Sequence, residues 1–171
     1  MKRKKSVRSS SDSRAFQWRS LLFWITLCEL AGIAGSVFTV SAIPTWYATL
    51  NRPSFSPPNW LFGPVWVILY MLMGIAIALV RQHTAMKNRV QKATQLFLVH
   101  LAANALWSPI FFGTKNIPLS FVVIGFVWVS LILLIFRFYE IEKKSAYLLL
   151  PYLAWISFAT VLNYNIWLLN P

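Results

Sequence analysis

Three segments of this sequence carry large aromatic side chains and a few hydrogen-bonding groups at helical spacing. Residues three or four apart share one face of a helix. Such faces suit a flat apolar ligand with polar edges, because rings stack on it and small residues such as Gly74 and Ala159 leave it room. The three stripes are Trp66, Tyr70 and Gly74; His100, Asn104, Ser108 and Phe111, with Trp107 adjoining; and Tyr152, Trp155, Ala159, Asn163 and Trp167.

Each stripe taken alone also suits a structural role. Aromatic and small residues pack membrane helices against one another, and Asn and Ser form hydrogen bonds between them. His100 shows the same ambiguity, since its imidazole could bind a haem iron. A lone helix histidine is more often a hydrogen-bonding packing residue, so iron ligation is the alternative interpretation.

The other reactive residue types are too few and too scattered for a familiar enzyme site. The sequence has four acidic residues, Asp12, Glu29, Glu140 and Glu142, and two histidines far apart. This distribution predicts no paired-carboxylate site, no metal cluster and no obligatory cofactor.

Glu29 is the acidic residue well inside an apolar segment. An ionised carboxylate there is costly, so we expect it to be neutral, paired or turned toward the interior of a bundle. A ligand contact and a structural hydrogen bond both fit. Small residues nearby suit a close helix crossing or a dimer interface; they are Ala31, Gly32, Gly35 and Ser36.

Composition places these segments in a membrane. The 171 residues are 58% hydrophobic and only 12% charged, which is too apolar for a surface exposed to water. A spanning helix needs about 20 mostly apolar residues, and the segments 20–41, 64–80, 93–113, 117–138 and 146–169 qualify. We predict an all-α fold, a polytopic membrane protein with one five-transmembrane-helix bundle over residues 20–171.

Basic residues predict how the chain crosses the membrane. Residues 1–19 carry seven Lys and Arg residues and are typical of a disordered tail beside anionic lipid rather than of a cleaved signal. The connections after the second and fourth spans carry four and three more, whereas the other side has only Arg52 and Lys115. We expect a cytoplasmic N-terminus and an outside C-terminus, in the cell membrane if the organism is prokaryotic. Membrane lipids then explain the net charge of +12, and no nucleic-acid partner is expected.

The connection over residues 44–63 differs from the others in carrying four prolines among five aromatic residues. Proline fixes φ and removes a donor, so the segment should be stiff and extended. Its aromatic residues fit two arrangements equally well. They could lie in the headgroup zone, or fold over the mouth of the bundle as a lid.

Three blocks of residues carry a more specific signal. They are WYxxLxxPSFxPPxWxFGPVWxxLYxxMG over residues 46–74, NALWSPIFFG over 104–113 and PYLAWxxFAxxLN over 151–163. In this order, within five spans, they resemble the signature of the TspO family of tryptophan-rich sensory proteins and translocator proteins. The resemblance covers roughly residues 20–170.

The resemblance implies a five-helix bundle that commonly forms a homodimer and holds one tetrapyrrole-sized pocket under the first loop. Members bind porphyrins and haem. Trp66 and Trp155 match tryptophans that the family associates with oxidative porphyrin degradation, and His100 stands where bacterial relatives usually have glutamine. Ligand-contacting positions would carry over to Tyr47, Trp66, Tyr70, Asn104, Trp107, Trp155 and Ala159.

The favoured hypothesis is therefore a membrane protein that binds porphyrin or haem for sensing, scavenging or transport. One alternative is an enzyme that degrades porphyrin in light and oxygen, using Trp66 and Trp155; enzymatic activity stays open, with binding favoured. The other alternative is a regulatory membrane partner without a small ligand.

Overall fold

The computed structural model describes residues 17–171 of the chain. Within them, five helical segments are long and apolar enough to cross a membrane, which confirms the predicted fold class of an integral membrane helix bundle. The basic tail lies almost wholly outside the described residues. The spanning helices are α1 (Trp18–Ala42), α2 (Asn59–Arg81), α3 (Lys87–Ser108) with a π-helical turn (Pro109–Gly113), α4 (Ile117–Tyr139), and α5 (Lys143–Leu148) followed by α6 (Leu150–Leu169).

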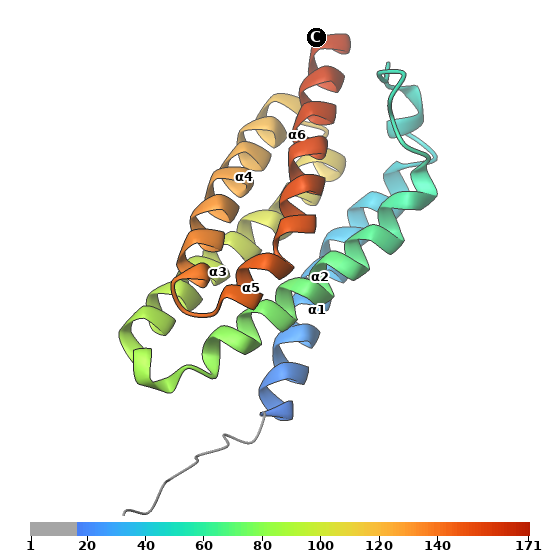
Figure 1. Ribbon diagram of the computed structural model, residues 1–171. Coiled ribbons are helices and arrows are strands. Elements are labelled where there is room, and N and C mark those ends of the chain that lie inside the picture. Colours follow the sequence, from blue (N-terminus) through green and yellow to red (C-terminus); the bar gives the residue numbers. More distant parts are fainter. Residues whose placement is uncertain (1–16) are drawn as a thin grey trace, which may run out of the picture.

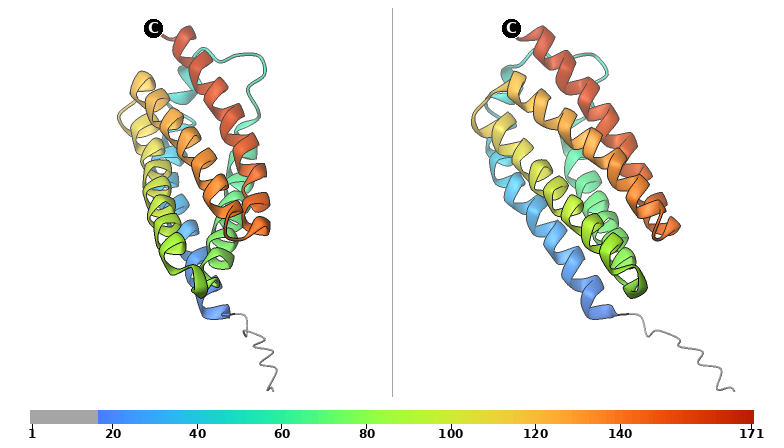
Figure 2. Two further views of the ribbon diagram at one scale, coloured as in Figure 1. Left: turned by 60° about the vertical axis from the view of Figure 1, so that its left-hand side comes forward. Right: turned by 90° about the vertical axis from the view of Figure 1, so that its left-hand side faces the viewer.

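The helices run up and down through one bundle (Figures 1 and 2). α1 packs along α2 and α3, α3 along α4, and α4 along α6. The C-terminus lies at the same end as the connection between α1 and α2, and the start of α1 lies at the opposite end with the connection between α2 and α3 (Figure 1). This arrangement places the first loop and the end of α6 at one end of the bundle.

Several spans differ in their limits from the sequence prediction; α3, for example, begins at Lys87 rather than at residue 93. α2 begins at Asn59 rather than at Pro64, which lies inside the helix. The helix can begin at Asn59 because Pro58 holds an extended ψ of 140° that ends the loop. The fifth span is interrupted between α5 and α6, where Pro151 cannot donate the hydrogen bond that would continue one helix.

Glycines bring α1 close to its neighbours, as the small-residue spacing predicted. A Cβ added to Gly32 would lie 2.5 Å from the Tyr70 ring, and one added to Gly35 would lie 3.3 Å from Cβ of Ser108. Gly74 meets α1 as well, since its added Cβ would lie 2.5 Å from Cα of Ile25. The interpretation that Gly74 leaves room for a ligand is therefore wrong, because backbone of α1 occupies that space.

His100 lies in the packed half of the bundle. Its ring is fully buried, with Nδ1 2.8 Å from Oγ of Ser130 and Nε2 3.1 Å from the hydroxyl of Tyr152. These bonds join α3 to α4 and α6. Both ring nitrogens are occupied by protein, so the alternative of a haem-iron ligand does not fit this structure.

Candidate functional site

A cavity of about 440 Å³ lies between α1, α2, α3 and α6. Aromatic rings of α2 and α6 meet between these two helices. The ring centroids of Phe62 and Trp155 are 5.8 Å apart, and those of Trp66 and Tyr152 are 6.1 Å apart. A space of this size is within the usual range for small-molecule sites.

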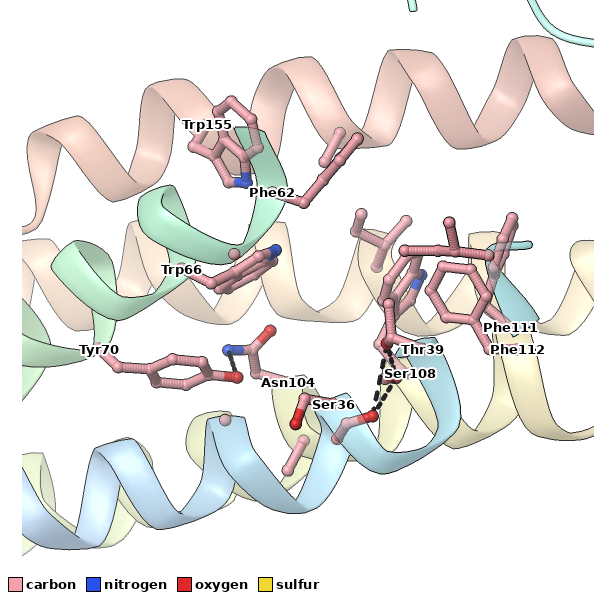
Figure 3. Close-up of a pocket in the computed structure, with 18 of the residues that line it drawn as sticks. Ser36, Thr39, Phe62, Trp66, Tyr70, Asn104, Ser108, Phe111, Phe112 and Trp155 are labelled. Carbon is pink, nitrogen blue, oxygen red and sulfur yellow. Dashed lines mark hydrogen bonds between the residues drawn. The ribbon is translucent and has the colours of Figure 1, made fainter. Parts of the chain in front are cut away.

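The residues that the family resemblance indicated all face this one space. Each of them lines the cavity, although they come from the first loop and three helices: Tyr47, Trp66, Tyr70, Asn104, Trp107, Trp155 and Ala159. Figure 3 shows Trp66 and Tyr70 of α2 on one side, with Asn104 of α3 facing them. The stripes also contain residues that turn into the packed core instead, among them His100 and Tyr152.

Hydrogen bonds hold the polar groups of the lining in fixed positions. The amide of Asn104 donates to the hydroxyl of Tyr70 at 3.1 Å, which leaves the Tyr70 hydroxyl hydrogen free to point elsewhere. Oγ of Ser108 donates to the carbonyl of Gly35 at 2.7 Å and lies 2.7 Å from Oγ1 of Thr39 (Figure 3). These hydrogen bonds therefore link α3 to both α1 and α2.

One wall of the cavity comes from α1, where the sequence analysis considered only Glu29 as a ligand contact. The wall carries one charged side chain, Glu29, and otherwise small or apolar residues; it consists of Glu29, Gly32, Ile33, Gly35, Ser36, Thr39, Val40 and Ile43. Glu29 thus faces a cavity inside the bundle, one of the arrangements expected for it. It is the one charged residue in the lining of this described cavity.

The π-helical turn after α3 closes the loop end of the cavity. Its Phe111 and Phe112 line the space and are at least nine-tenths buried. Phe111 stacks on Trp107 at 5.1 Å, and Trp46 of the loop packs edge-on against Phe111 at 5.4 Å. The presence of Pro109 in a predicted span was the available signal for this irregular turn.

The first loop sends some aromatic residues inward and others outward. Tyr47 is 5% exposed and packs on the rings of Phe111 and Phe112, whereas Trp60 is 72% exposed. Both residues border the cavity. The loop therefore covers the end of the cavity, as the lid arrangement predicts, whereas Trp60 lies exposed in the first turn of α2. A position of such aromatic residues in the headgroup zone stays a prediction.

Arg52 stabilises the lid above Tyr47. Its guanidinium lies 5.2 Å from the centroid of the Tyr47 ring and donates to Oδ1 of Asn59 at 3.2 Å. Burial raises the pKa of the Tyr47 phenol, although the neighbouring Arg52 acts in the opposite direction. Tyr47 consequently stays neutral and can act as a hydrogen-bond donor at physiological pH.

The lid is also tied to the end of α6. The backbone N–H of Asn51 donates to Oδ1 of Asn170 at 3.0 Å, and Nδ2 of Asn170 donates to the carbonyl of Asn51 at 2.9 Å. Nδ2 of Asn51 also reaches the carbonyl of Leu169 at 3.4 Å. The last residues of the chain thus hold the lid in place.

Comparison with known proteins identifies the family, because residues 24–168 match the TspO/MBR family. The chain belongs to the TspO/MBR family. Over 152 residues it is 41% identical to the tryptophan-rich protein TspO of Chlorobaculum tepidum, covering 89% of this chain and 96% of that one. It is also 45% identical over 139 residues to a tryptophan-rich protein TspO of Archaeoglobus fulgidus, covering 81% and 89% of the two chains.

A translocator protein also appears among the relatives of this TspO/MBR protein. The translocator protein of Homo sapiens is 36% identical over 140 residues, covering 81% of this chain and 83% of the human one. The matches span the loop and the cavity-lining helices. Within residues 17–171, no group of three or more His, Cys, Asp or Glu side chains could hold a metal ion.

Proposed function

We propose that this protein binds porphyrin- or haem-type tetrapyrroles in the cavity between α1, α2, α3 and α6, for sensing, scavenging or transport. The observation that carries the proposal is the convergence of Tyr47, Trp66, Trp107 and Trp155 on one space. A flat macrocycle gains most from aromatic walls on which it can stack. The few polar groups in the lining would orient its edges.

The proposal predicts saturable binding of protoporphyrin to the purified protein in detergent. We expect Trp66→Phe and Trp155→Phe each to weaken binding by about threefold to tenfold, because each loses the larger indole surface and its N–H. The change in porphyrin absorbance on binding measures this affinity without depending on the number of tryptophans.

Trp128→Phe is the matched control for these variants. Trp128 lies on α4, donates to Oγ of Ser157 at 2.9 Å and does not line the cavity. Its replacement should leave the affinity unchanged. Equal affinities for the wild type, Trp66→Phe and Trp155→Phe would show that the pocket is misplaced.

A second candidate function is light- and oxygen-dependent porphyrin degradation. It is favoured by the presence of both Trp66 and Trp155 in the lining of one cavity. Either indole could donate one electron to a photoexcited porphyrin, giving an indole radical cation and a porphyrin radical anion. Dioxygen would then add to the radical anion and form a C–O bond. Return of one electron to the indole radical cation restores the tryptophan and leaves a neutral porphyrin–dioxygen adduct from which the ring opens. Illuminated samples should form product, and formation should stop in either Phe variant at porphyrin concentrations that saturate it.

The proposed partners are a tetrapyrrole, the surrounding lipids and a second copy of the chain. The homodimer is proposed on the family resemblance, and α1 offers it an outward apolar face that includes Leu22, Leu30 and Val37. Cross-linking in native membranes tests this: a band at twice the mass of the chain supports the dimer, and a monomer band alone contradicts it.

A further inference from the structure

Asn163 of α6 is a buried amide on the wall of the cavity. Its side chain is 2% exposed and lines the space between the helices. Oδ1 accepts a hydrogen bond from Nε1 of Trp107 at 3.1 Å, and Oγ of Ser120 lies 3.1 Å from the same oxygen. The amide therefore connects α6 to α3 and α4 through its oxygen alone.

The contact with Trp107 fixes which way the amide points. An indole N–H can only donate, so the atom that faces it must be the amide oxygen rather than the nitrogen. Nδ2 is thereby turned away from Trp107, and it has no hydrogen-bond partner in the part of the chain that the structure describes. A buried donor without a partner is costly, so it marks a place where another group belongs.

A second buried donor on α6 also lacks a hydrogen-bond partner. Nε1 of Trp155 is enclosed and lacks a partner among residues 17–171. Trp155 and Asn163 are eight positions apart, which places them on one face of α6 with Ala159 between them. All three line the cavity. The α6 wall thus contains two enclosed N–H donors without a partner, on residues about 12 Å apart along the helix axis and on either side of a small residue.

We infer that this wall is an acceptor-recognising subsite, in which Nδ2 of Asn163 donates to a neutral oxygen on the edge of the bound tetrapyrrole. Nε1 of Trp155 offers a second donor to the same ligand. The inference rests on the proposed function and adds the chemical class of the ligand's substituents. The competing explanation is a structural amide whose N–H₂ is satisfied by water.

The charge of the cavity explains why the oxygen should be neutral. No Lys or Arg lines the described cavity, and its one charged residue is Glu29 on the opposite wall. A ligand carboxylate would therefore find hydrogen-bond donors but no positive charge to balance its own. It would also face the carboxyl group of Glu29 across the cavity. An ester, a ring carbonyl or a protonated carboxyl group accepts the hydrogen bond without that cost.

A comparison of two porphyrins distinguishes the contribution of the hydrogen bond to the affinity from that of the stacking contacts. Protoporphyrin dimethyl ester carries carbonyl oxygens, whereas etioporphyrin has only alkyl substituents and no oxygen. We expect Asn163→Leu to weaken binding of the ester by about threefold to tenfold, with binding of etioporphyrin almost unchanged. Ser120→Ala is the matched control, because it removes a contact to Oδ1 and leaves Nδ2 in place; it should affect the two porphyrins equally.

Infrared spectroscopy of the wild-type complex gives a second readout that does not depend on a variant folding. The carbonyl band of the ¹³C-labelled ester should shift to lower frequency on binding, as a hydrogen-bonded carbonyl does. In Asn163→Leu that shift should shrink.

Each outcome distinguishes the inference from the proposed function. Equal effects of Asn163→Leu on both porphyrins, or a bound carbonyl band at the frequency of an unbonded ester, would overturn the subsite and leave tetrapyrrole binding intact. Failure of the wild type to bind either porphyrin would instead overturn the proposed function, and the subsite with it.

Discussion

At the scale of single residues, Glu29 sets the electrostatic character of the cavity. Its carboxyl group lies on a wall that is otherwise small or apolar, and when ionised it repels other carboxylates. Charges interact strongly where water is scarce, because the effective dielectric constant is low. A ligand with ionised carboxylates should therefore be disfavoured when they approach α1.

We therefore expect the protein to prefer an esterified porphyrin over the free diacid, and Glu29→Gln to reduce this preference. Wild-type protein should bind protoporphyrin dimethyl ester more tightly than the free diacid, and Glu29→Gln should narrow the ratio of the two affinities by about tenfold. Paired absorbance titrations measure the ratio. Glu140→Gln removes a carboxylate outside the cavity and should leave the ratio of the two affinities unchanged. An unchanged ratio in Glu29→Gln would mean that the group is uncharged in the bound state.

The residues of the candidate site were predicted unevenly from the sequence. The aromatic stripes could be predicted because Trp and Tyr at helical spacing form a distinctive pattern. The family resemblance then identified which residues of the stripes line the same cavity. Most of the α1 wall was missed because apolar residues occur all around α1, and lipid accepts apolar side chains as readily as a protein core does. The orphan N–H of Asn163 was beyond prediction, because it depends on which way one amide faces Trp107.

At the scale of helices, the crossing of α1 and α2 depends on Gly74. Its added Cβ would lie 2.5 Å from Cα and 2.8 Å from N of Ile25, so a methyl group there meets backbone that cannot rotate away. We expect Gly74→Ala to lower the free energy of unfolding by about 1–3 kcal/mol. Thermal unfolding in detergent, followed by circular dichroism, measures the change.

Gly125 provides the matched control for this helix crossing. It lies inside α4, and an added Cβ would meet nothing within 4 Å. Gly125→Ala should therefore be neutral or stabilising by about 0.5–1 kcal/mol, since alanine is the better helix former. Destabilisation of both variants to the same extent would contradict the proposed close approach at Gly74.

An ion pair connects two helix connections at the end opposite the lid. Nε2 of His83 lies 3.0 Å from Oε2 of Glu142, which also accepts from the backbone N–H of Lys144 at 3.1 Å through its other oxygen. Partial burial acts to raise the pKa of Glu142, but the Lys144 N–H and His83 outweigh it and the pKa is lowered.

The lowered pKa of Glu142 predicts how stability depends on pH. A carboxyl group whose pKa is lower in the folded state stabilises fully above its ordinary pKa, near about 4.3, and loses that contribution as pH falls through the folded value. Glu142→Gln should therefore reduce the stability lost on acidification below about pH 5, by less than about 1 kcal/mol because the pair is partly exposed. Unfolding curves between neutral and acidic pH test this. A pH dependence identical to that of the wild type would contradict it.

The helix limits show where local sequence was informative. Five spans followed from hydropathy, because every backbone group in a bilayer must be satisfied within a helix. Pro64 was wrongly taken as the start of the second span, since a proline favours a first turn but does not exclude an interior position when another turn precedes it. The break before Pro151 was missed because the apolar run continues across it.

At the scale of the whole molecule, the distribution of charge predicts the orientation in the membrane. The described basic residues at the end away from the lid are Arg19, Arg81, Lys87, Arg89, Lys92, Arg137, Lys143 and Lys144, against Arg52 and Lys115 near the lid. Cytoplasmic connections are the ones enriched in Lys and Arg. The lid and the C-terminus should therefore lie outside.

Labelling of single cysteines tests this orientation. In a Cys28→Ser background, an impermeant maleimide applied to intact cells should label Lys115→Cys, and should label Arg89→Cys only after lysis. Cys28 is the one cysteine of the sequence, so the background is free of other thiols. The reverse labelling pattern would invert the topology.

The bonds between Asn51 and Asn170 have a practical consequence for anyone handling the protein. An affinity tag fused after Pro171, or a protease that removes the final two residues, would disturb or remove the hydrogen bonds that anchor the first loop to the end of α6. Preparations tagged at opposite termini could then disagree about ligand exchange while having identical helices. Protein tagged at the N-terminus keeps these hydrogen bonds intact and is therefore the better material for ligand-exchange measurements.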